Sequence, residues 1–103
     1  MSKRLEMLEK LAASGKADAF ALYALAMEYR SAERAEDALR TFETLREKDA
    51  AYLPMYLMAG QLLLEQSRPH DAREWLEAGV MLATSKGDAK AKNELVAALS
   101  ECD

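Results

Sequence analysis

The sequence predicts an all-α protein of about six antiparallel helices, arranged as stacked helical hairpins. The first reason is a repeat at a spacing of 34 residues, in which Arg34 recurs as Arg68 and Asp37 recurs as Asp71. The second is a composition dominated by Ala, Leu, Glu, Lys and Arg, which favour helix. The third is that no run of alternating β-branched residues indicates a strand. A period of this length is typical of solenoids built from pairs of helices.

Periodic apolar residues predict the first three helices over residues 2–13, 19–31 and 35–48. Gly15 ends the first helix, and Asp18 is placed to cap the second. The residues expected to face the core are Leu5, Leu8, Leu11 and Ala12, then Leu22, Leu25, Ala26 and Tyr29, and then Ala38, Leu39, Phe42 and Leu45.

Prolines and a glycine mark the remaining three helices. Pro54 and Pro69 suit the first turns of the fourth and fifth helices, where no intrahelical donor is lost. The fifth helix is expected to run to about Ser85. Gly87 can adopt the left-handed conformation that ends it, and Asp88 can cap the sixth. The sixth helix is expected to pack through Leu95, Val96 and Leu99, with Lys90, Lys92, Asn93, Glu94 and Glu101 facing away.

The positions that recur are the small and large residues that let two helices approach closely. Ala26 and Gly60 are small partners on one helix of each hairpin, and Ala38 and Ala72 are small partners on the other. In this pattern the sequence resembles the tetratricopeptide repeat (TPR) family and its small stand-alone bacterial members. The residues that carry the resemblance are Leu22, Leu25, Ala26, Tyr29, Ala38, Phe42, Leu45 and Ala50 in the first unit, and Tyr56, Ala59, Gly60, Leu63, Ala72, Leu76, Gly79 and Thr84 in the second.

The resemblance implies a single TPR-like α-α superhelix over residues 1–103. Residues 1–18 would form a lone helix of the second, or B, type, because Leu8 and Leu11 stand one period before Phe42 and Leu45. Full repeats would span 19–52 and 53–86. Residues 87–103 would form a capping helix of the first, or A, type, displaced by about two residues. Arg4 departs from the family pattern, because it stands where alanine is usual.

Charge and residue usage argue against several classes of function. The net charge is −4, from 18 acidic and 14 basic residues without a basic cluster, so we expect no nucleic-acid partner. No apolar run is long enough for a membrane span, and the first residues do not read as a secretion signal. A lone Cys102, expected at a frayed end, fits a reducing cytoplasm. His70 is expected to be solvated and has no cysteine nearby, so we expect no metal site. The sequence has no Ser, His and Asp set, no glycine-rich phosphate loop and no CxxC motif, so we expect neither a cofactor nor enzyme activity.

In the TPR family, ligands lie on the concave wall formed by the A helices, and in this sequence that wall is apolar. The resemblance therefore implies a peptide-binding groove lined by Phe20, Tyr23, Met27, Arg30, Leu57, Met58, Gln61 and Leu64. Met27 and Gln61 stand where carboxylate-clamping TPR proteins have asparagine, so no such clamp is expected. The expected partner is an unidentified protein or peptide bound through apolar contacts. Two alternatives stay open: the sixth helix covers part of this wall as core, or the wall joins two copies in a homodimer.

Overall fold

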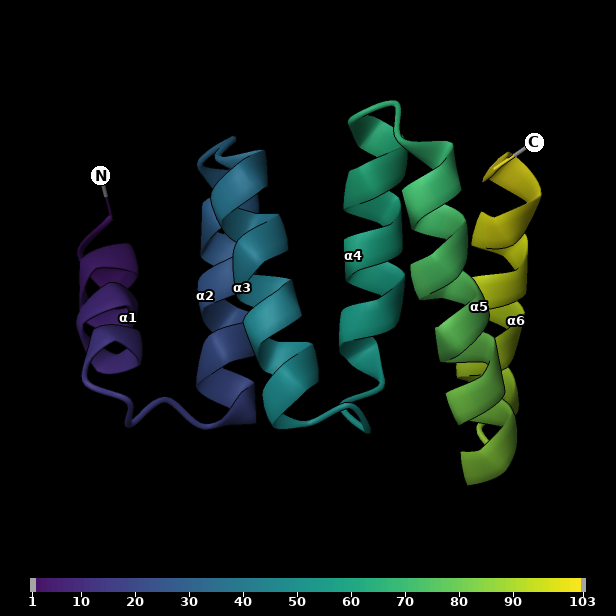
Figure 1. Cartoon of the computed structure of the whole chain (residues 1–103), viewed down its shortest axis with the longest axis horizontal. Coiled ribbons are helices and arrows are strands. Elements are labelled where there is room, and N and C mark those ends of the chain that lie inside the picture. Colours follow the sequence, from purple (N-terminus) through teal and green to yellow (C-terminus); the bar gives the residue numbers. More distant parts are fainter. Residues whose placement is uncertain (1, 103) are drawn as a thin grey trace. The chain divides into compact units, whose positions relative to one another are not determined.

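A computed structural model describes residues 2–102, which form six α-helices and a short 3₁₀ helix, with no β-strand in that range (Figure 1). The all-α prediction is therefore confirmed, and every helix start and every helix end that was predicted lies within about two residues of the observed bound. The helices are α1 (Lys3–Ala13), α2 (Ala19–Ser31), α3 (Ala35–Lys48), α4 (Pro54–Glu65), α5 (Pro69–Lys86) and α6 (Ala89–Leu99), followed by η1 (Ser100–Cys102).

The chain divides into two compact units, residues 1–50 and 51–103. In the first unit α2 pairs with α3, and α1 packs against α2. In the second unit α4 pairs with α5, and α6 packs against α5 and also against α4. Each unit thus contains one helical hairpin and one additional helix.

The core of each unit is made by residues related by the period of 34. Ala26, Ala38, Phe42 and Leu45 are fully or almost fully buried in the first unit. Their equivalents Gly60, Ala72, Leu76 and Gly79 are buried in the second. The predicted alternation of small and large residues is therefore the packing rule of both hairpins.

Two glycines in the second unit show how closely its helices approach. A Cβ added to Gly60 on α4 would overlap Cδ2 of Leu76 on α5 and would lie 2.6 Å from its Cγ. A Cβ added to Gly79 on α5 would lie 2.7 Å from Cβ of Tyr56 and 2.8 Å from Cδ2 of Leu95. The close packing of α4, α5 and α6 therefore requires glycine at both positions, because a side chain at either one would overlap a neighbouring helix.

The turn inside each hairpin is the same structure repeated. Glu33 and Ser67, 34 residues apart, have φ values of 60° and 58°. The residue that follows donates its backbone N–H across the helix end. Arg34 donates to the carbonyl of Tyr29, and Arg68 donates to the carbonyl of Leu63, both at 2.9 Å. This is a Schellman end with a left-handed residue that is not glycine. Because neither position is a glycine, this turn could not be predicted from the sequence.

The predicted capping residues Asp18, Gly87 and Asp88 mark their helix ends, and Ser2, which was not predicted, adds a fourth cap. Asp18 Oδ1 accepts a hydrogen bond from Ala21 N at 2.8 Å, and Asp88 Oδ1 accepts one from Ala91 N at 3.0 Å. Gly87 has φ of 69°, in the left-handed region that glycine favours. Ser2 caps α1 by accepting a hydrogen bond from Leu5 N.

Three predictions about packing are wrong. Leu11, expected in the core, is exposed, because α1 packs against α2 through Leu5, which is buried as predicted. Val96 is also exposed, and Ala98 takes its place beside Leu95 in the contact of α6 with the rest of the unit. Cys102 is buried in η1 rather than frayed, with its Sγ 4.0 Å from the carbonyl oxygen of Ala98.

The second unit also departs from the strict repeat at the end of α5. Helix α5 has 18 residues and α3 has 14, so α5 continues one turn further before Gly87 ends it. Trp75 on α5 is buried with its ring centroid 5.9 Å from that of Tyr56 on α4. No helix within residues 2–102 combines the length and apolar character that crossing a bilayer requires.

Candidate functional site

The predicted site residues of the first unit lie on one side of α2. Phe20 is 66% exposed, although it is a large apolar side chain. Tyr23, Met27 and Arg30 follow at helical spacing and are half-buried. Tyr23 also rests against the core, with its ring centroid 6.4 Å from that of Phe42. This side of α2 is therefore an apolar surface with Phe20 at its exposed end.

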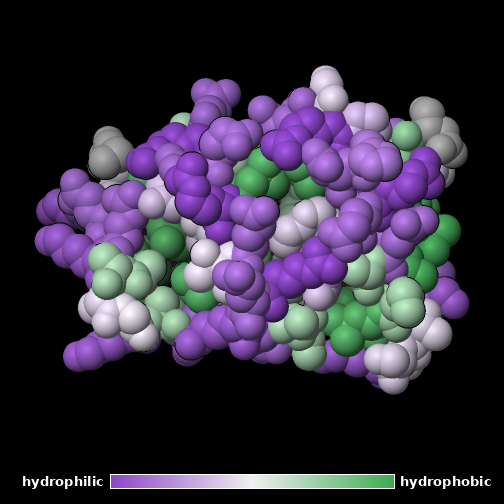
Figure 2. Space-filling view, in the orientation of Figure 1, coloured by the Kyte–Doolittle hydropathy of each residue, from purple (hydrophilic) through white to green (hydrophobic). Residues whose placement is uncertain are grey.

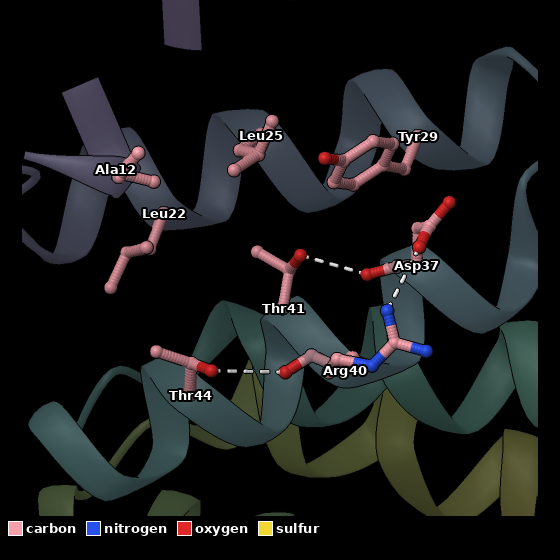
Figure 3. A pocket seen from close by; sticks show the side chains of 9 residues that line it. Ala12, Leu22, Leu25, Tyr29, Asp37, Arg40, Thr41 and Thr44 are labelled. Atoms are coloured by element: carbon pink, nitrogen blue, oxygen red, sulfur yellow. Dashed lines mark hydrogen bonds and ion pairs between the residues drawn. The ribbon is translucent and has the colours of Figure 1, made fainter. Parts of the chain in front are cut away.

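A hollow of about 330 Å³ lies in the same unit and was not predicted (Figure 3). Helical spacing places it on the side of α2 away from Phe20. Figure 3 shows the apolar residues of α2 along one side and the threonines of α3 along the other. Thr41 and Thr44 donate their hydroxyls to backbone carbonyls of α3, at 2.8 Å and 3.2 Å. The lining residues are Ala12, Ala13, Leu22, Leu25, Tyr29, Asp37, Arg40, Thr41 and Thr44.

A polar network beside this hollow joins α1, α2 and α3. Tyr29 donates its hydroxyl to Glu9 Oε2 at 2.6 Å, and the Arg34 guanidinium lies 4.7 Å from the Tyr29 ring centroid. Arg34 and Arg40 both pair with Asp37 at 2.9 Å. Burial and the hydrogen bond to the Glu9 carboxylate raise the pKa of Tyr29 to about 12. These contacts hold the three helices in place, so the polar side chains around the hollow are engaged with one another.

The predicted site residues of the second unit are less exposed. Leu57, Met58, Gln61 and Leu64 on α4 are all half-buried. Gln61 and Leu64 line a hollow of about 350 Å³ together with Glu65 and with Glu101 of η1. Since α6 also packs against α4, the C-terminal segment borders this part of the surface. The C-terminal segment therefore forms one border of the surface at Gln61 and Leu64.

Hydrophilic side chains dominate the face of the protein drawn in Figure 2, and hydrophobic ones show there as small patches. Exposed apolar residues that were not singled out from the sequence are Met7 on α1 and Met81 on α5, which is 75% exposed. Helical spacing alone did not identify them, because it shows a stripe without showing what covers it.

Groups that could carry chemistry are dispersed. No three His, Cys, Asp or Glu side chains in residues 2–102 come together as ligands for a metal ion. His70 is exposed in the first turn of α5, as predicted. The Asp37 carboxylate is held between two arginines, Arg34 and Arg40.

Comparison with solved structures gives the relationship of this chain. It is 34% identical to a tetratricopeptide repeat domain protein from Salinibacter ruber, whose solution structure matches with a TM-score of 0.77 over 82% of this chain and 86% of that one. The chain belongs to the tetratricopeptide repeat family. The crystal structure of the Salinibacter ruber TPR protein matches with a TM-score of 0.76, also at 34% identity, over 82% of this chain and 96% of that one.

A further solved structure matches nearly the whole chain. The solution structure of protein BPP2914 from Bordetella parapertussis is 26% identical, with a TM-score of 0.83, over 99% of this chain and 89% of that one. No protein-family model matches the sequence, and no curated protein matches it. Membership of the TPR family supports a general role as a protein-interaction module.

Proposed function

We propose that this TPR protein binds an apolar segment of a partner protein on the side of α2 that carries Phe20, Tyr23, Met27 and Arg30. The observation that carries the proposal is the 66% exposure of Phe20 beside two half-buried apolar residues. Exposed apolar surface of this kind marks interaction sites. Methionine adds an adaptable contact, because its unbranched chain fits irregular partners.

The proposal extends to α4, where the repeat places Leu57, Met58, Gln61 and Leu64. Leu57 and Met58 keep part of their surface open and are apolar, which suits the same kind of segment. Complete burial of two exposed apolar side chains contributes about 3–6 kcal/mol before ordering costs, and Phe20 and Met27 would contribute less than this because Met27 is already half-buried. This range suits a reversible adaptor.

The proposed setting is the bacterial cytoplasm, and the proposed role is binding rather than catalysis. The similar solved structures come from the bacteria Salinibacter ruber and Bordetella parapertussis, and the lone thiol of Cys102 suits a reducing compartment. The repeat fold is an interaction scaffold, which favours an adaptor over an enzyme.

Selection from a phage-displayed peptide library against the immobilised full chain tests the proposal. Apolar peptides should be enriched, and Phe20→Glu should weaken their binding about tenfold or more. Met81→Glu is the matched control, because Met81 is a large apolar residue that is also mostly exposed but lies on α5. Circular dichroism of each variant reports whether the helices are kept.

Two results would overturn the proposal. One is selected peptides that bind wild type and Phe20→Glu equally well. The other is a wild-type chain that sediments as a homodimer which Phe20→Glu dissociates. The second result would assign the α2 surface to self-association instead.

A further inference from the structure

Helix α1 is joined to its unit by few apolar contacts. Leu5 is the side chain that it buries, and Leu8 and Ala12 are half-buried. Helix α6 is also 11 residues long, but it buries Leu95 and Ala98 and packs against both α4 and α5. A helix of this length is marginally stable alone in water, so α1 depends on its contacts with α2.

Two carboxylates connect α1 to its neighbours by charge. Glu9 of α1 accepts a hydrogen bond from the Tyr29 hydroxyl at 2.6 Å and lies 3.8 Å from the Arg34 guanidinium. Glu28 of α2 lies 3.8 Å from Nε of Arg4 on α1. The two arginine side chains are 38% and 61% exposed, and ion pairs as exposed as these contribute little to stability. The hydrogen bond from Tyr29 to Glu9 is therefore the strongest polar contact of α1.

The segment that follows α1 has the features of a hinge. Residues 14–16 are exposed, and a Cβ added to Gly15 would meet nothing within 4 Å. Ala17, by contrast, is buried, and Asp18 caps α2. Movement of α1 can therefore be confined to residues 14–16, while the start of α2 stays in place.

Helix α1 supplies part of the wall of the hollow in this unit (Figure 3). Ala12 and Ala13 line the hollow together with Leu22, Leu25 and Tyr29 of α2. The three residues of α2 stand at spacings of three and four, so they share one face of that helix. Departure of α1 would remove its part of the wall and open this apolar face of α2 to solvent.

The hairpin of α2 and α3 has a core of its own. Ala26 on α2 and Ala38 on α3 are fully buried, as is Phe42 on α3. The Phe42 ring centroid lies 6.4 Å from that of Tyr23 on α2. These contacts do not include α1, so they remain when α1 departs.

We infer that α1 is a strap that opens and closes on α2 as one unit, turning about residues 14–16 while α2 and α3 stay paired. Regions with few buried apolar contacts open at lower free energy than the rest of a protein. The closed strap blocks the face of Leu22, Leu25 and Tyr29, which makes it an autoinhibitory contact for that face. Phe20 lies on the other side of α2, so this inference and the proposed function do not require each other.

Native-state hydrogen exchange of the full chain tests the inference, measured by nuclear magnetic resonance at several low urea concentrations. The amides of α1 should share one protection factor, at least about tenfold below that of the most protected amides of α2 and α3. Their exchange should depend weakly on urea, because opening of α1 exposes little surface. Exchange of the most protected amides of α2 and α3 should depend strongly on urea.

Two core variants separate opening of α1 from unfolding of the whole unit. Phe42→Leu weakens the hairpin, so it should lower the protection of α2 and α3 about fivefold or more and leave that of α1 within about twofold. Leu5→Ala weakens the docking of α1 and should lower the protection of α1 about tenfold or more.

A matched pair of charge variants tests the polar contact. Glu9→Ala removes the acceptor of the Tyr29 hydrogen bond and should lower the protection of α1 about tenfold. Glu6→Ala removes an exposed carboxylate of the same helix and should lower it about threefold at most.

Thiol labelling reports whether the face of α2 is uncovered. The probe is Leu25→Cys in a chain that also carries Cys102→Ala, so that one thiol is present. Adding Glu9→Ala should raise the labelling rate about tenfold, and adding Phe42→Leu should leave it within about twofold.

Three results would overturn the inference. The first is that α1 has the same protection and urea dependence as α2 and α3. The second is that Phe42→Leu lowers the protection of α1 and of the hairpin by the same factor, since α1 would then unfold only with its unit. The third is protection that rises steadily along α1 from Lys3, which would show fraying from the end of the helix.

Discussion

Substitution of Gly60 by alanine tests the close approach of α4 and α5. The new Cβ would overlap Leu76 Cδ2 and would lie 2.6 Å from Cγ, which is nearer than atoms in a folded core tolerate. Leu76 is fully buried, so its side chain has no open space into which to turn.

Two effects of opposite sign set the magnitude. Overpacking of a filled core costs about 1–3 kcal/mol, and contact with the branch point of a leucine favours the upper part of that range. Replacing glycine by alanine inside a helix stabilises the folded state by about 0.5–1 kcal/mol, because the unfolded chain then loses less backbone entropy on folding. The expected net change is a loss of about 2 kcal/mol in the free energy of unfolding. Urea denaturation followed by circular dichroism measures it.

A double-mutant cycle separates the two effects. In a Leu76→Ala background the clash is absent, so Gly60→Ala should become stabilising by about 0.5–1 kcal/mol. Leu76→Ala alone costs about 2–5 kcal/mol, so all variants are compared with the same added osmolyte. Glu43 is exposed on α3, so the difference in stability between Glu43→Gly and Glu43→Ala measures the effect of helix propensity alone. A gain on Gly60→Ala in the wild-type background, or the same sign in both backgrounds, would refute the reasoning.

Three further predictions concern turns, pH and caps. Glu33→Gly and Ser67→Gly should each raise the free energy of unfolding by about 1 kcal/mol in urea titrations, because both positions have positive φ; a loss would contradict the left-handed turns. Tyr29 has a higher pKa folded (about 12) than its ordinary value of 10.0, so stability should fall as the pH rises from 10 to 12. Glu9→Gln should lower the pKa of Tyr29 in an NMR titration, and an unchanged value would remove Glu9 as a cause. Asp88→Ala should cost about 1 kcal/mol and raise the amide hydrogen exchange of α6, whereas unchanged exchange would show that the cap is dispensable.

Local signals explain why the helix bounds could be predicted. The residues that mark helix ends act through hydrogen bonds and backbone angles within their own turns, so the sequence predicts their effect. They are Asp18, Pro54, Gly87 and Asp88. The period of 34 added the pairing of helices, because it aligned small residues such as Gly60 with the large ones that fill the space beside them.

Features that depend on how helices rotate against one another could not be predicted. Leu11 belongs to the apolar stripe of α1, yet the helix buries Leu5 and leaves Leu11 open. The hydrogen bond from Tyr29 to Glu9 joins residues 20 apart through the docking of α1 on α2. Glu33 adopts a left-handed conformation that glycine would have signalled.

In the candidate site, too, features within one helix could be predicted and features that depend on the packing of several helices could not. The resemblance to the TPR family placed Phe20, Tyr23 and Met27 on one side of the second helix, and on α2 they follow one another at helical spacing. The hollow beside Thr41 escaped prediction because it arises from the seating of α1 and α3 on α2. The border that η1 makes with Leu64 depends on the extra turn of α5 and the course of the chain after it.

The most direct test of the proposed function is a chemical-shift map of the full chain with a library-selected peptide. Binding on the α2 surface predicts that the largest changes fall on Phe20, Tyr23 and Met27 and that they vanish in Phe20→Glu. Changes of the same size centred elsewhere in the chain, with α2 unaffected, would contradict the account.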